Sequence, residues 1–363
     1  MMKGIFMKKN MLIISAGKGY GGAEKSIELV IKNLKNKFNI LVGVSDEKLK
    51  KNLIEDQINI FSLKNSKLFI IYNIFILFFK VRKYDIIIAN TNKDAFYLAI
   101  LSIIFNLSRK NILVYMRDHQ WKFRKFIFKS LKNAKYILPT ETLLEDNNYM
   151  KKYLNKDQLY VIEEAVDLKN VSFKMGKYIL ILANISRLKG IDLLLKAYVN
   201  SNVIKDNIKL IICGKVQDDI YFKEILMFIT KNKLEPFVEI RDFQDDYQKD
   251  ILYRNSLMVI NSSISEYGGP ETFGRTIIEA WSYKKPVISF NVGGPKYIID
   301  NGINGFLVEE KNIKELSEKI SLLSNNRNLC KIFGENGYNK VILKYTVEII
   351  IKKLLKYLNE KYI

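Results

Sequence analysis

The sequence predicts an α/β protein with two doubly wound domains, each a parallel sheet covered by helices. The chain has 363 residues, which exceeds the size at which one hydrophobic core keeps growing, so two domains of about 150–200 residues are expected. Short β-branched runs alternate with longer amphipathic stretches along the whole chain, as they do in βαβ units. Hydrophobic residues make up 48% of the chain, a fraction typical of a folded protein.

The strand candidates form two sets, and each set is about one doubly wound sheet long. A polar, Gly-containing stretch without clear periodicity follows the first set at 166–176, and we place the domain boundary there. The expected domains are therefore residues 1–166 and 167–345, followed by a C-terminal segment, 346–363, whose residues 347–358 read as an amphipathic helix. The strand candidates are 11–16, 40–44, 85–89, 112–116, 136–138 and 159–162 in the first set, and 178–183, 209–213, 238–241, 257–260, 286–289 and 306–308 in the second.

The composition excludes several classes of protein. Two Cys and one His cannot build a disulfide framework or a usual Cys/His zinc cluster, and they fit a reducing compartment. The longest apolar run, 68–79, is shorter than the roughly 20 residues of a membrane-spanning helix. The apolar stretch 11–16 is too short for the core of a signal peptide. We therefore expect a cytoplasmic protein.

The net charge of +21 is concentrated in the first half of the chain. Residues 1–166 hold 29 Lys or Arg and 15 Asp or Glu, a net of 29 − 15 = +14. Basic and aromatic residues interleave around the run 68–79 and again at 121–129. Such a surface suits an anionic membrane face, a phosphorylated lipid or nucleic acid. The alternative is a Lys-rich proteome that raises the charge of every protein.

A glycine loop, residues 17–24, follows the first strand candidate and opens a helix. Backbone N–H groups at such a helix start can bind phosphate, and glycine lets a ligand approach closely. Gly17, Gly19 and Gly22 satisfy the pattern G-x-G-x-x-G. A dinucleotide site also needs an acid at the end of the second strand, a role that Asp46 could take. A nicotinamide-dependent enzyme is therefore one alternative.

Two carboxylates, Glu271 and Glu279, mark a second candidate site. Residues 268–270, Gly-Gly-Pro, break the chain, so Glu271 is expected in a loop before a helix that starts near 272–274. Glu279 then lies one to two turns inside that helix, and a ligand at the helix mouth could meet both acids. The alternatives are that Glu271 caps the helix and that Glu279 is a solvated surface residue.

At these residues the sequence resembles the GT-B fold glycosyltransferases of the large retaining family 4, glycosyltransferase group 1. The resemblance covers nearly the whole chain and is carried by 21–24, GGAE; 185–194, ISRLKGIDLL; 210–214, LIICG; the two glutamates, with seven residues between them; 286–288, PVI; and 301–308, NGINGFLV. It implies two Rossmann-like domains that face each other across a cleft, with the C-terminal helix packing back towards the first domain.

The resemblance also implies a reaction. A sugar would pass with retention of configuration from a nucleoside-diphosphate sugar, UDP- or GDP-linked, to an acceptor, with no metal and no further cofactor. Lys189 would pair with the donor diphosphate, Glu271 would contact the transferred sugar, and Glu279 would bind the ribose hydroxyls. The remaining donor-binding candidates are Gly21, Gly22, Arg187, Gly214, Thr272, Phe273 and Gly274.

The chain departs from the family pattern at several places, among them Glu164-Ala165 where Asn-Gly is common and Tyr297 where Glu is common, and two further departures concern the site. The family's usual Arg falls on Asn184, which leaves Arg187 as a possible substitute. The family often has a His and an acid near the transferred sugar at the end of the fourth strand of the first domain. Here either Arg117 and Asp118 take those positions, on the acceptor side, or His119 does, as a catalytic residue.

No convincing Asp-x-Asp metal motif is present. The adjacent acids Asp218-Asp219 and Asp245-Asp246 are interpreted as solvated loop residues.

The leading hypothesis is a retaining glycosyltransferase that extends a bacterial surface glycan, as in capsule or lipopolysaccharide synthesis. Its acceptor would be a glycan or a polyprenyl-linked precursor, and its basic first domain would lie on the inner face of the plasma membrane as a peripheral protein. The alternatives are a GT-B fold sugar-nucleotide epimerase and the nicotinamide-dependent enzyme. A nucleic-acid binder is not expected, because no recognisable RNA- or DNA-binding motif is present.

Overall fold

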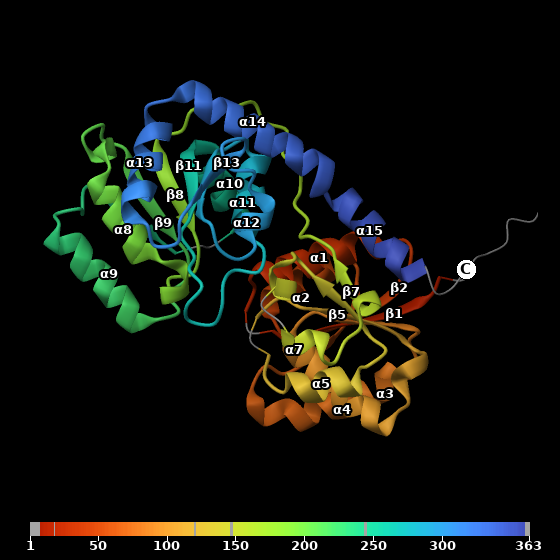
Figure 1. The fold of residues 1–363 in the computed structure, drawn as a ribbon. Helices are drawn as coiled ribbons and strands as arrows, with labels where there is room; N and C mark the ends of the chain where they lie inside the picture. The colour runs from red at the N-terminus through yellow and green to blue at the C-terminus, as the bar shows by residue number, and fades with distance from the viewer. Residues whose placement is uncertain (1–7, 18, 120, 146–147, 243–244, 360–363) are drawn as a thin grey trace, which may run out of the picture. The chain divides into compact units, whose positions relative to one another are not determined.

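The computed structural model describes residues 8–17, 19–119, 121–145, 148–242 and 245–359. The chain forms two compact units (Figure 1). Domain 1 comprises the residues up to Ala165 together with those from Val347, and domain 2 is Val166–Thr346. These limits lie within one residue of the expected ones, and the C-terminal helix belongs to domain 1.

Domain 1 is built on a seven-stranded parallel sheet in the order β3-β2-β1-β4-β5-β6-β7. The strands are β1 Asn10–Ser15, β2 Asn39–Val44, β3 Asn59–Ser62, β4 Ile86–Ala89, β5 Asn111–Tyr115, β6 Lys135–Leu138 and β7 Leu159–Val161. The α-helices are α1 Gly22–Leu34, α2 Glu47–Glu55, α3 Ile70–Val81, α4 Asn92–Ile104, α5 Arg124–Ser130, α6 Thr142–Glu145, α7 Asn148–Lys151 and α15 Val347–Asn359; short 3-10 turns are η1 Lys67–Phe69, η2 Leu107–Arg109 and η3 Lys156–Gln158.

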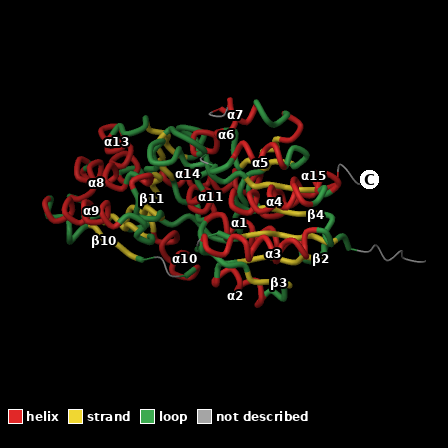
Figure 2. The backbone as a smooth tube through the Cα atoms, turned by 90° about the horizontal axis from the view of Figure 1, so that it is seen from below, coloured by secondary structure: helices red, strands yellow, loops and turns green. Residues whose placement is uncertain are grey.

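Both faces of this sheet are covered, because successive side chains of a strand point to opposite faces. In β1, Leu12 and Ile14 pack into a core shared with α3, α4 and α5. Met11 and Ile13 pack into a second core with α1, α2 and α15. Figure 1 shows these helix layers on the two sides of the sheet, and Figure 2, seen from below, shows strands of the sheet running side by side.

The sequence analysis missed β3. This strand has four residues, lies at the edge of the sheet and pairs only with β2 in the described chain. None of its residues is fully buried, so its sequence lacks the apolar run that marks the inner strands.

Domain 2 has a six-stranded parallel sheet in the order β10-β9-β8-β11-β12-β13. The strands are β8 Tyr178–Leu182, β9 Lys209–Cys213, β10 Val238–Arg241, β11 Ser256–Asn261, β12 Val287–Phe290 and β13 Gly305–Val308. The helices are α8 Ile191–Asn200, α9 Asp219–Lys231, α10 Asp246–Asn255, α11 Arg275–Ser282, α12 Pro295–Ile298, α13 Ile313–Ser324 and α14 Arg327–Lys344, with 3-10 turns η4 Arg187–Lys189 and η5 Asn202–Ile204.

The helices of domain 2 also form two layers. Helices α8, α9 and α13 pack on one face of the sheet, and α10, α11 and α12 pack on the other. The long helix α14 supplies Phe333 to the first core and Val341 to the second. The predicted fold class, two doubly wound α/β domains, is thus confirmed for each domain, while the cleft between them stays a prediction.

The strand order places candidate sites in both domains. The direction of winding reverses between β1 and β4 in domain 1 and between β8 and β11 in domain 2. In open α/β sheets, ligands bind at the carboxyl ends of the strands beside such a reversal. A ligand site is therefore expected in the loops that follow these four strands. Among the described residues, no helix combines the length and the hydropathy needed to cross a membrane.

Candidate active site

In domain 2, hydrogen bonds join the loop after β8 to the loop after β11. The Ser262 hydroxyl donates to the carbonyl oxygen of Lys189 at 2.8 Å, and the Ile264 N–H donates to the carbonyl oxygen of Leu188 at 2.9 Å. Gly190 lies between them with φ +56°, and a Cβ there would be 2.3 Å from the Ser262 carbonyl oxygen. Only glycine allows this close approach, which fixes where the Lys189 side chain starts.

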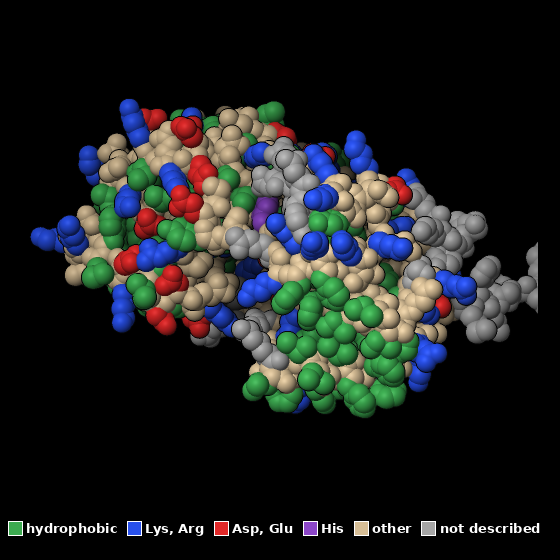
Figure 3. All heavy atoms as spheres, turned by 60° about the horizontal axis from the view of Figure 1, so that its bottom comes forward, with side chains coloured by type: hydrophobic (Ala, Val, Ile, Leu, Met, Phe, Trp, Pro, Cys, Tyr) green, Lys and Arg blue, Asp and Glu red, His purple; other side chains and the backbone are tan. Residues whose placement is uncertain are grey.

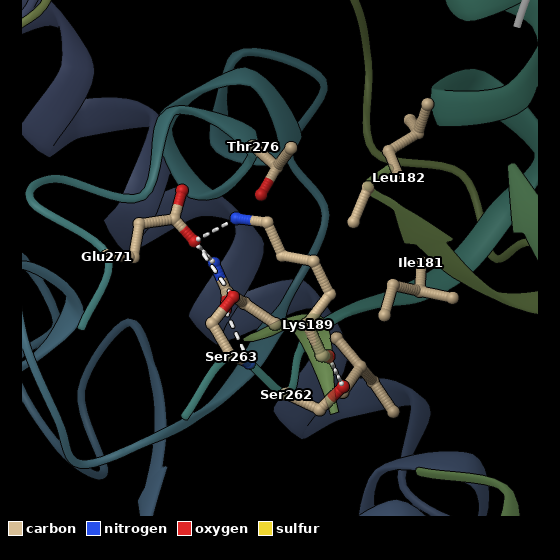
Figure 4. A pocket seen from close by; sticks show the side chains of 10 residues that line it. Ile181, Leu182, Lys189, Ser262, Ser263, Glu271 and Thr276 are labelled. Carbon is tan, nitrogen blue, oxygen red and sulfur yellow. Dashed lines mark hydrogen bonds and ion pairs between the residues drawn. The ribbon is translucent and has the colours of Figure 1, made fainter. Parts of the chain in front are cut away.

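The Lys189 side chain reaches Glu271, the first carboxylate of the predicted pair. Lys189 Nζ lies 3.1 Å from Glu271 Oε2. The same oxygen accepts hydrogen bonds from Asn261 Nδ2 at 3.1 Å and from Ser263 Oγ at 3.0 Å. Figure 4 shows Lys189 extended toward Glu271, with Thr276 beside its ammonium group. The two residues that the sequence analysis assigned to diphosphate and sugar are therefore neighbours.

These partners determine the ionisation of Glu271. Burial by itself would raise the pKa of this carboxyl group, but the attraction of Lys189 and the hydrogen bonds from Asn261, Lys189 and Ser263 outweigh it and lower the pKa. Glu271 is therefore anionic at neutral pH. It can stabilise positive charge, and it cannot act as a proton donor in this state.

A small cavity lies beside the Lys189–Glu271 pair. Its volume is about 40 Å³, and it is lined by the ends of β8 and β11 together with Lys189, Glu271 and Thr276. A cavity holds one water molecule at about 10–15 Å³ in this measure, so the cavity admits a small group such as one phosphate or hydroxyl of a larger ligand. Thr276 lies in the first turn of α11, where backbone N–H groups have no acceptor within the helix.

A glycine turn after β12 holds the Glu271 loop in place. The Gly294 N–H donates to the Glu271 carbonyl oxygen at 2.6 Å. A Cβ on Gly293 would lie 2.4 Å from that oxygen, and one on Gly294 would lie 2.4 Å from Phe273 Cα. Phe273 is itself buried against the ring of Tyr345. The backbone of the loop is thus fixed from two sides.

The structure excludes the capping alternative for Glu271. Helix α11 begins at Arg275, later than the predicted start, and its N-cap is Gly274 with φ +100°. Glu271 therefore lies outside the first helical turn. Gly274 ends the loop in a left-handed conformation that other residues rarely adopt. The backbone of Thr272, Phe273 and Gly274 therefore lies in the loop between Glu271 and the helix start, where the sequence analysis had expected the helix to begin.

Glu279 is not a solvated surface residue, so that alternative is wrong. It is 5% exposed and lies in the fifth position of α11. Its carboxylate accepts from Lys249 Nζ at 2.5 Å, from the Tyr253 hydroxyl at 2.9 Å and from Arg275 Nε at 3.1 Å. Burial would raise its pKa, but the charges of Lys249 and Arg275 lower it. Its assignment to ribose stays a prediction.

Two other donor-binding candidates, Arg187 and Gly214, make close contacts with other residues of domain 2. Arg187 Nη2 lies 2.5 Å from Glu224 Oε1, and the guanidinium group stacks over the Tyr221 ring. A Cβ on Gly214 would lie 2.0 Å from the Ala183 carbonyl oxygen, so glycine is needed there for packing between the loops after β8 and β9. These contacts do not bring Arg187 to the Lys189–Glu271 pair.

Each adjacent acid pair lies where a loop joins a helix, with the first acid in the loop and the second in the helix, which refines that interpretation. Asp218 and Asp245 are the N-caps of α9 and α10, and each accepts a backbone N–H three residues on. Asp219 and Asp246 occupy the first turns of the same helices. Negative charge is favourable at helix N-termini, which accounts for all four acids. In the described part of the chain, no three His, Cys, Asp or Glu side chains gather as a metal site would require.

In domain 1 the glycine loop carries its own carboxylate. Gly21 is the N-cap of α1 and Gly22 its first residue. Glu24 Oε2 accepts the Gly21 N–H at 3.0 Å, and a Cβ on Gly17 would lie 2.2 Å from Glu24 Oε1. The Glu24 side chain thus occupies the start of α1 that could bind a phosphate.

Asp46, the acid that a dinucleotide site would require, has a structural role in domain 1. Asp46 is the N-cap of α2 and accepts the Leu49 N–H at 2.8 Å. A carboxylate used in this way is not oriented toward the hydroxyls of a ribose, so the structure does not support a nicotinamide site.

Arg117 is a structural residue of domain 1. Its side chain is 8% exposed and forms an ion pair with Glu164. Its Nε donates to the side chain and backbone oxygens of Asn90, both at 3.1 Å, and its Nη2 donates to Ser26 Oγ at 3.3 Å. The guanidinium group therefore joins the loops after β4 and β5 to α1, and this burial speaks against Arg117 as an acceptor-side group.

The other two candidates of this segment lie in the loop after β5. Asp118 is exposed and His119 is half-buried. The structure places both at the carboxyl edge of the sheet, where ligands bind in such folds. Their roles stay predictions.

The sequence analysis missed Asn261, Ser263, Lys249 and Tyr253. The first two follow the predicted strand 257–260, and a polar run at the end of an inner strand could have drawn attention to them. Lys249 and Tyr253 lie on α10 and meet Glu279 only through the tertiary fold, so no local pattern marks them.

Residues 163–340 match the family model of the glycosyl transferases group 1. An uncharacterized glycosyltransferase of Methanocaldococcus jannaschii is 32% identical over 224 residues, which are 58% of this chain and 59% of that protein. The poly(ribitol-phosphate) alpha-N-acetylglucosaminyltransferase of Staphylococcus aureus is 29% identical over 275 residues, 70% of this chain and 52% of that protein. The chain thus spans between half and three fifths of the length of these relatives.

Solved structures share the fold over nearly the whole chain. Anabaena HepE in complex with UDP and glucose has a TM-score of 0.82 at 21% identity, covering 97% of this chain and 100% of that one. The lipopolysaccharide outer core galactosyltransferase WaaB has a TM-score of 0.69 at 18% identity, covering 97% and 99%. At these identities the likeness establishes the two-domain fold alone.

Proposed function

Because residues 163–340 match the family model of the glycosyl transferases group 1, we propose that this chain is a retaining, metal-independent glycosyltransferase that uses a nucleoside-diphosphate sugar. One observation carries the proposal. Within the matched segment, Lys189 and Glu271 lie together at the carboxyl edge of the sheet, beside the reversal of strand order. A cation and an anion fixed side by side suit a reaction that separates charge.

Lys189 supplies charge to the leaving group. When the bond between sugar and diphosphate breaks, negative charge grows on the nucleoside diphosphate, and an ammonium group beside it lowers the barrier. Lys189 reaches the diphosphate by exchanging its contact with Glu271 for one with a phosphate oxygen. The first turn of α11 lies beside it and adds backbone N–H groups.

Glu271 faces the opposite charge. The sugar gains oxocarbenium character as the bond breaks, and an anionic carboxylate stabilises it. Asn261 and Ser263 hold the carboxylate in place even when Lys189 turns to the phosphate. In the absence of ligand, the lowered pKa of Glu271 keeps its carboxylate charged at neutral pH.

We propose UDP as the nucleotide of the donor. Anabaena HepE has been solved with UDP-glucose, and the pneumococcal O-GlcNAc transferase GtfA with UDP and GlcNAc. Glu279, at the fifth position of α11, is the candidate for the ribose hydroxyls. Its present partners, Lys249 and Arg275, would remain to balance its charge.

The acceptor is proposed to be a glycan or a lipid-linked glycan of a bacterial surface polymer. The support comes from relatives and neighbours named for such polymers: a poly(ribitol-phosphate) transferase, the capsular polysaccharide enzyme CapM of Staphylococcus aureus, and WaaB. The sugar and the linkage follow from single loop residues and are left to experiment.

Thermal melting with UDP, GDP, ADP and CMP in EDTA tests the donor site. A ligand at 100 times its dissociation constant stabilises the protein by about 2.7 kcal/mol, which is visible as a melting shift. We expect UDP to raise the melting temperature of the wild type. The apparent affinity of Lys189→Ala for UDP, obtained from its melting shifts, should be at least tenfold lower. Lys196→Ala is the matched control, because Lys196 lies on α8 and pairs with Asp192.

Substitution of Glu279 affects the stability of the protein as well as ligand binding, because the residue is buried with two cations. Glu279→Ala would remove the carboxylate that lies between Lys249 and Arg275, at a cost of about 3–5 kcal/mol in stability. Glu279→Gln keeps the shape and is the better variant. Equal melting shifts in the wild type, Lys189→Ala and Glu279→Gln would contradict the assigned site, and no shift with any nucleotide would contradict the donor class.

A further inference from the structure

Helix α3 of domain 1 exposes an apolar face that its own domain does not cover. Asn73, Leu77 and Val81 are its buried residues, and they point toward the core. The opposite face is apolar as well. We define the apolar patch as Leu68 of η1 with Ile71, Tyr72, Phe75 and Phe79 of α3, which are exposed by 88%, 81%, 42%, 62% and 55%.

The spacing of these residues makes one continuous stripe. Positions 68, 71, 72, 75 and 79 recur at three and four residues, so they share one side of the helix. Phe75 and Phe79 are in edge-to-face contact at 5.0 Å between ring centroids. Ile103 and Ile104, at the end of the neighbouring helix α4, are exposed too. Figure 3 shows hydrophobic side chains gathered over the corresponding side of domain 1, with Lys and Arg at the margin.

Two segments of the domain 1 sequence are rich in positive charge, although acids flank both of them. Residues 57–84, which include η1 and α3, contain five Lys or Arg and no Asp or Glu. Residues 119–140, which include α5, contain six Lys or Arg and again no acid. Arg82 and Lys83 are exposed directly after α3. A second copy of this chain would bring a similar positive margin against the first, which disfavours self-association.

We propose that the apolar patch inserts into the surface of an anionic lipid bilayer. Helix α3 has 12 residues, about 18 Å at 1.5 Å per residue, and the hydrocarbon core is about 30 Å thick. The helix therefore lies along the membrane plane. Its apolar stripe enters the acyl boundary, and the flanking Lys and Arg contact phosphate headgroups. This inference goes beyond the proposed function, because the binding requires neither donor nor acceptor.

Vesicle flotation of the purified full chain tests the proposal. We expect the wild type to bind vesicles that contain phosphatidylglycerol, to bind pure phosphatidylcholine vesicles at least tenfold more weakly, and to lose affinity as salt rises. The double variant Ile71→Glu/Phe75→Glu should lose at least tenfold in partitioning. Both side chains are exposed, so the variant should melt at the wild-type temperature and keep its UDP-induced shift.

The matched control is Ile220→Glu/Met227→Glu on α9 of domain 2, where the two residues are exposed by 70% and 63%. It adds the same charge to another helix and should bind vesicles as the wild type does. Equal vesicle binding by the α3 variant and the wild type would overturn the proposal. So would absence of wild-type binding to anionic vesicles, or a dimer in light scattering that the α3 variant abolishes.

Discussion

At the residue scale, the Lys189–Glu271 pair is organised before any ligand arrives. One oxygen of Glu271 receives three donors, of which only Lys189 is expected to leave for the diphosphate. Asn261 and Ser263 keep the carboxylate in position. The charge that the reaction needs is therefore already in place, which reduces the reorganisation required in the transition state.

This arrangement predicts the effect of Glu271→Gln. Glutamine keeps the size and one acceptor oxygen but loses the charge, so kcat should fall by about 100- to 1,000-fold, the range seen when one electrostatic group is removed. KM for the donor should change much less. Steady-state release of the nucleoside diphosphate measures both. Glu318→Gln, on the exposed side of α13, is the control, and a similar loss in that variant would contradict the assignment.

A buried lysine predicts a pH dependence of stability. Lys285 is 2% exposed and donates to the Lys174 carbonyl oxygen at 2.7 Å. Burial lowers its pKa from 10.5 to about 8. Between these pH values the unfolded chain binds the proton more tightly than the folded one, so this residue makes the free energy of unfolding rise with pH.

Urea unfolding of Lys285→Met beside the wild type measures this contribution. Methionine removes the buried charge. The free energy of unfolding of the variant should therefore exceed that of the wild type most at pH 7, and this difference should shrink toward pH 10. An unchanged difference across this range would show that Lys285 does not titrate there.

At the scale of elements, two neighbouring loops build the site and a third supports it. The loops after β8 and β11 supply Lys189, Asn261 and Ser263, because those strands are adjacent in the sheet. The turn at Gly293-Gly294, after β12, holds the backbone of the Glu271 loop. The chemistry thus depends on backbone contacts that carry no charge themselves.

Gly294→Ala tests this support. Its new Cβ would lie 2.4 Å from Phe273 Cα, and backbone cannot move aside as a flexible side chain can. We expect a loss of about 1–3 kcal/mol in the free energy of unfolding, as for other overpacked sites. Activity per folded molecule should fall as well, because the Glu271 loop is displaced.

Gly302→Ala is a useful comparison for that variant. Gly302 has a positive φ, and a Cβ added there would have no atom within 4 Å. The substitution therefore measures the effect of backbone strain without a steric clash. Wild-type activity in Gly294→Ala, measured at a temperature where the variant is folded, would contradict the supporting role of the turn.

At the scale of the whole molecule, the end of the chain completes the first domain. Helix α15 buries Ile350, Ile351, Leu354 and Leu358 in the core shared with α1 and α2. Lys353 Nζ also lies 2.6 Å from Glu163 Oε2. Domain 1 is therefore assembled from both ends of the sequence, and domain 2 from the continuous segment between them.

Removal of the residues after Thr346 should unfold domain 1 and spare domain 2. Each buried aliphatic side chain of α15 contributes about 1.5–3 kcal/mol, and the four together approach the whole stability of a domain, about 5–15 kcal/mol. Calorimetry should show one transition lost, while the segment 166–346 by itself keeps its helical circular dichroism. Two intact transitions after truncation would contradict this dependence on α15.

The sequence by itself determined the fold class, twelve of the thirteen strands of the described structure and the division into two domains. These features follow from local periodicity and from motifs in which the residues stand close to a strand end. The roles of all the candidate ligand-binding residues stay predictions.

Only the tertiary structure decided which polar groups are already paired and which apolar faces are covered. Glu279 meets Lys249 from another helix, and Arg117 meets Glu164 across 47 positions of the chain. Helix α3 reads as apolar all round, and only its packing separates the covered side from the exposed one. Burial and pairing depend on contacts between distant segments, and local sequence patterns do not record those contacts.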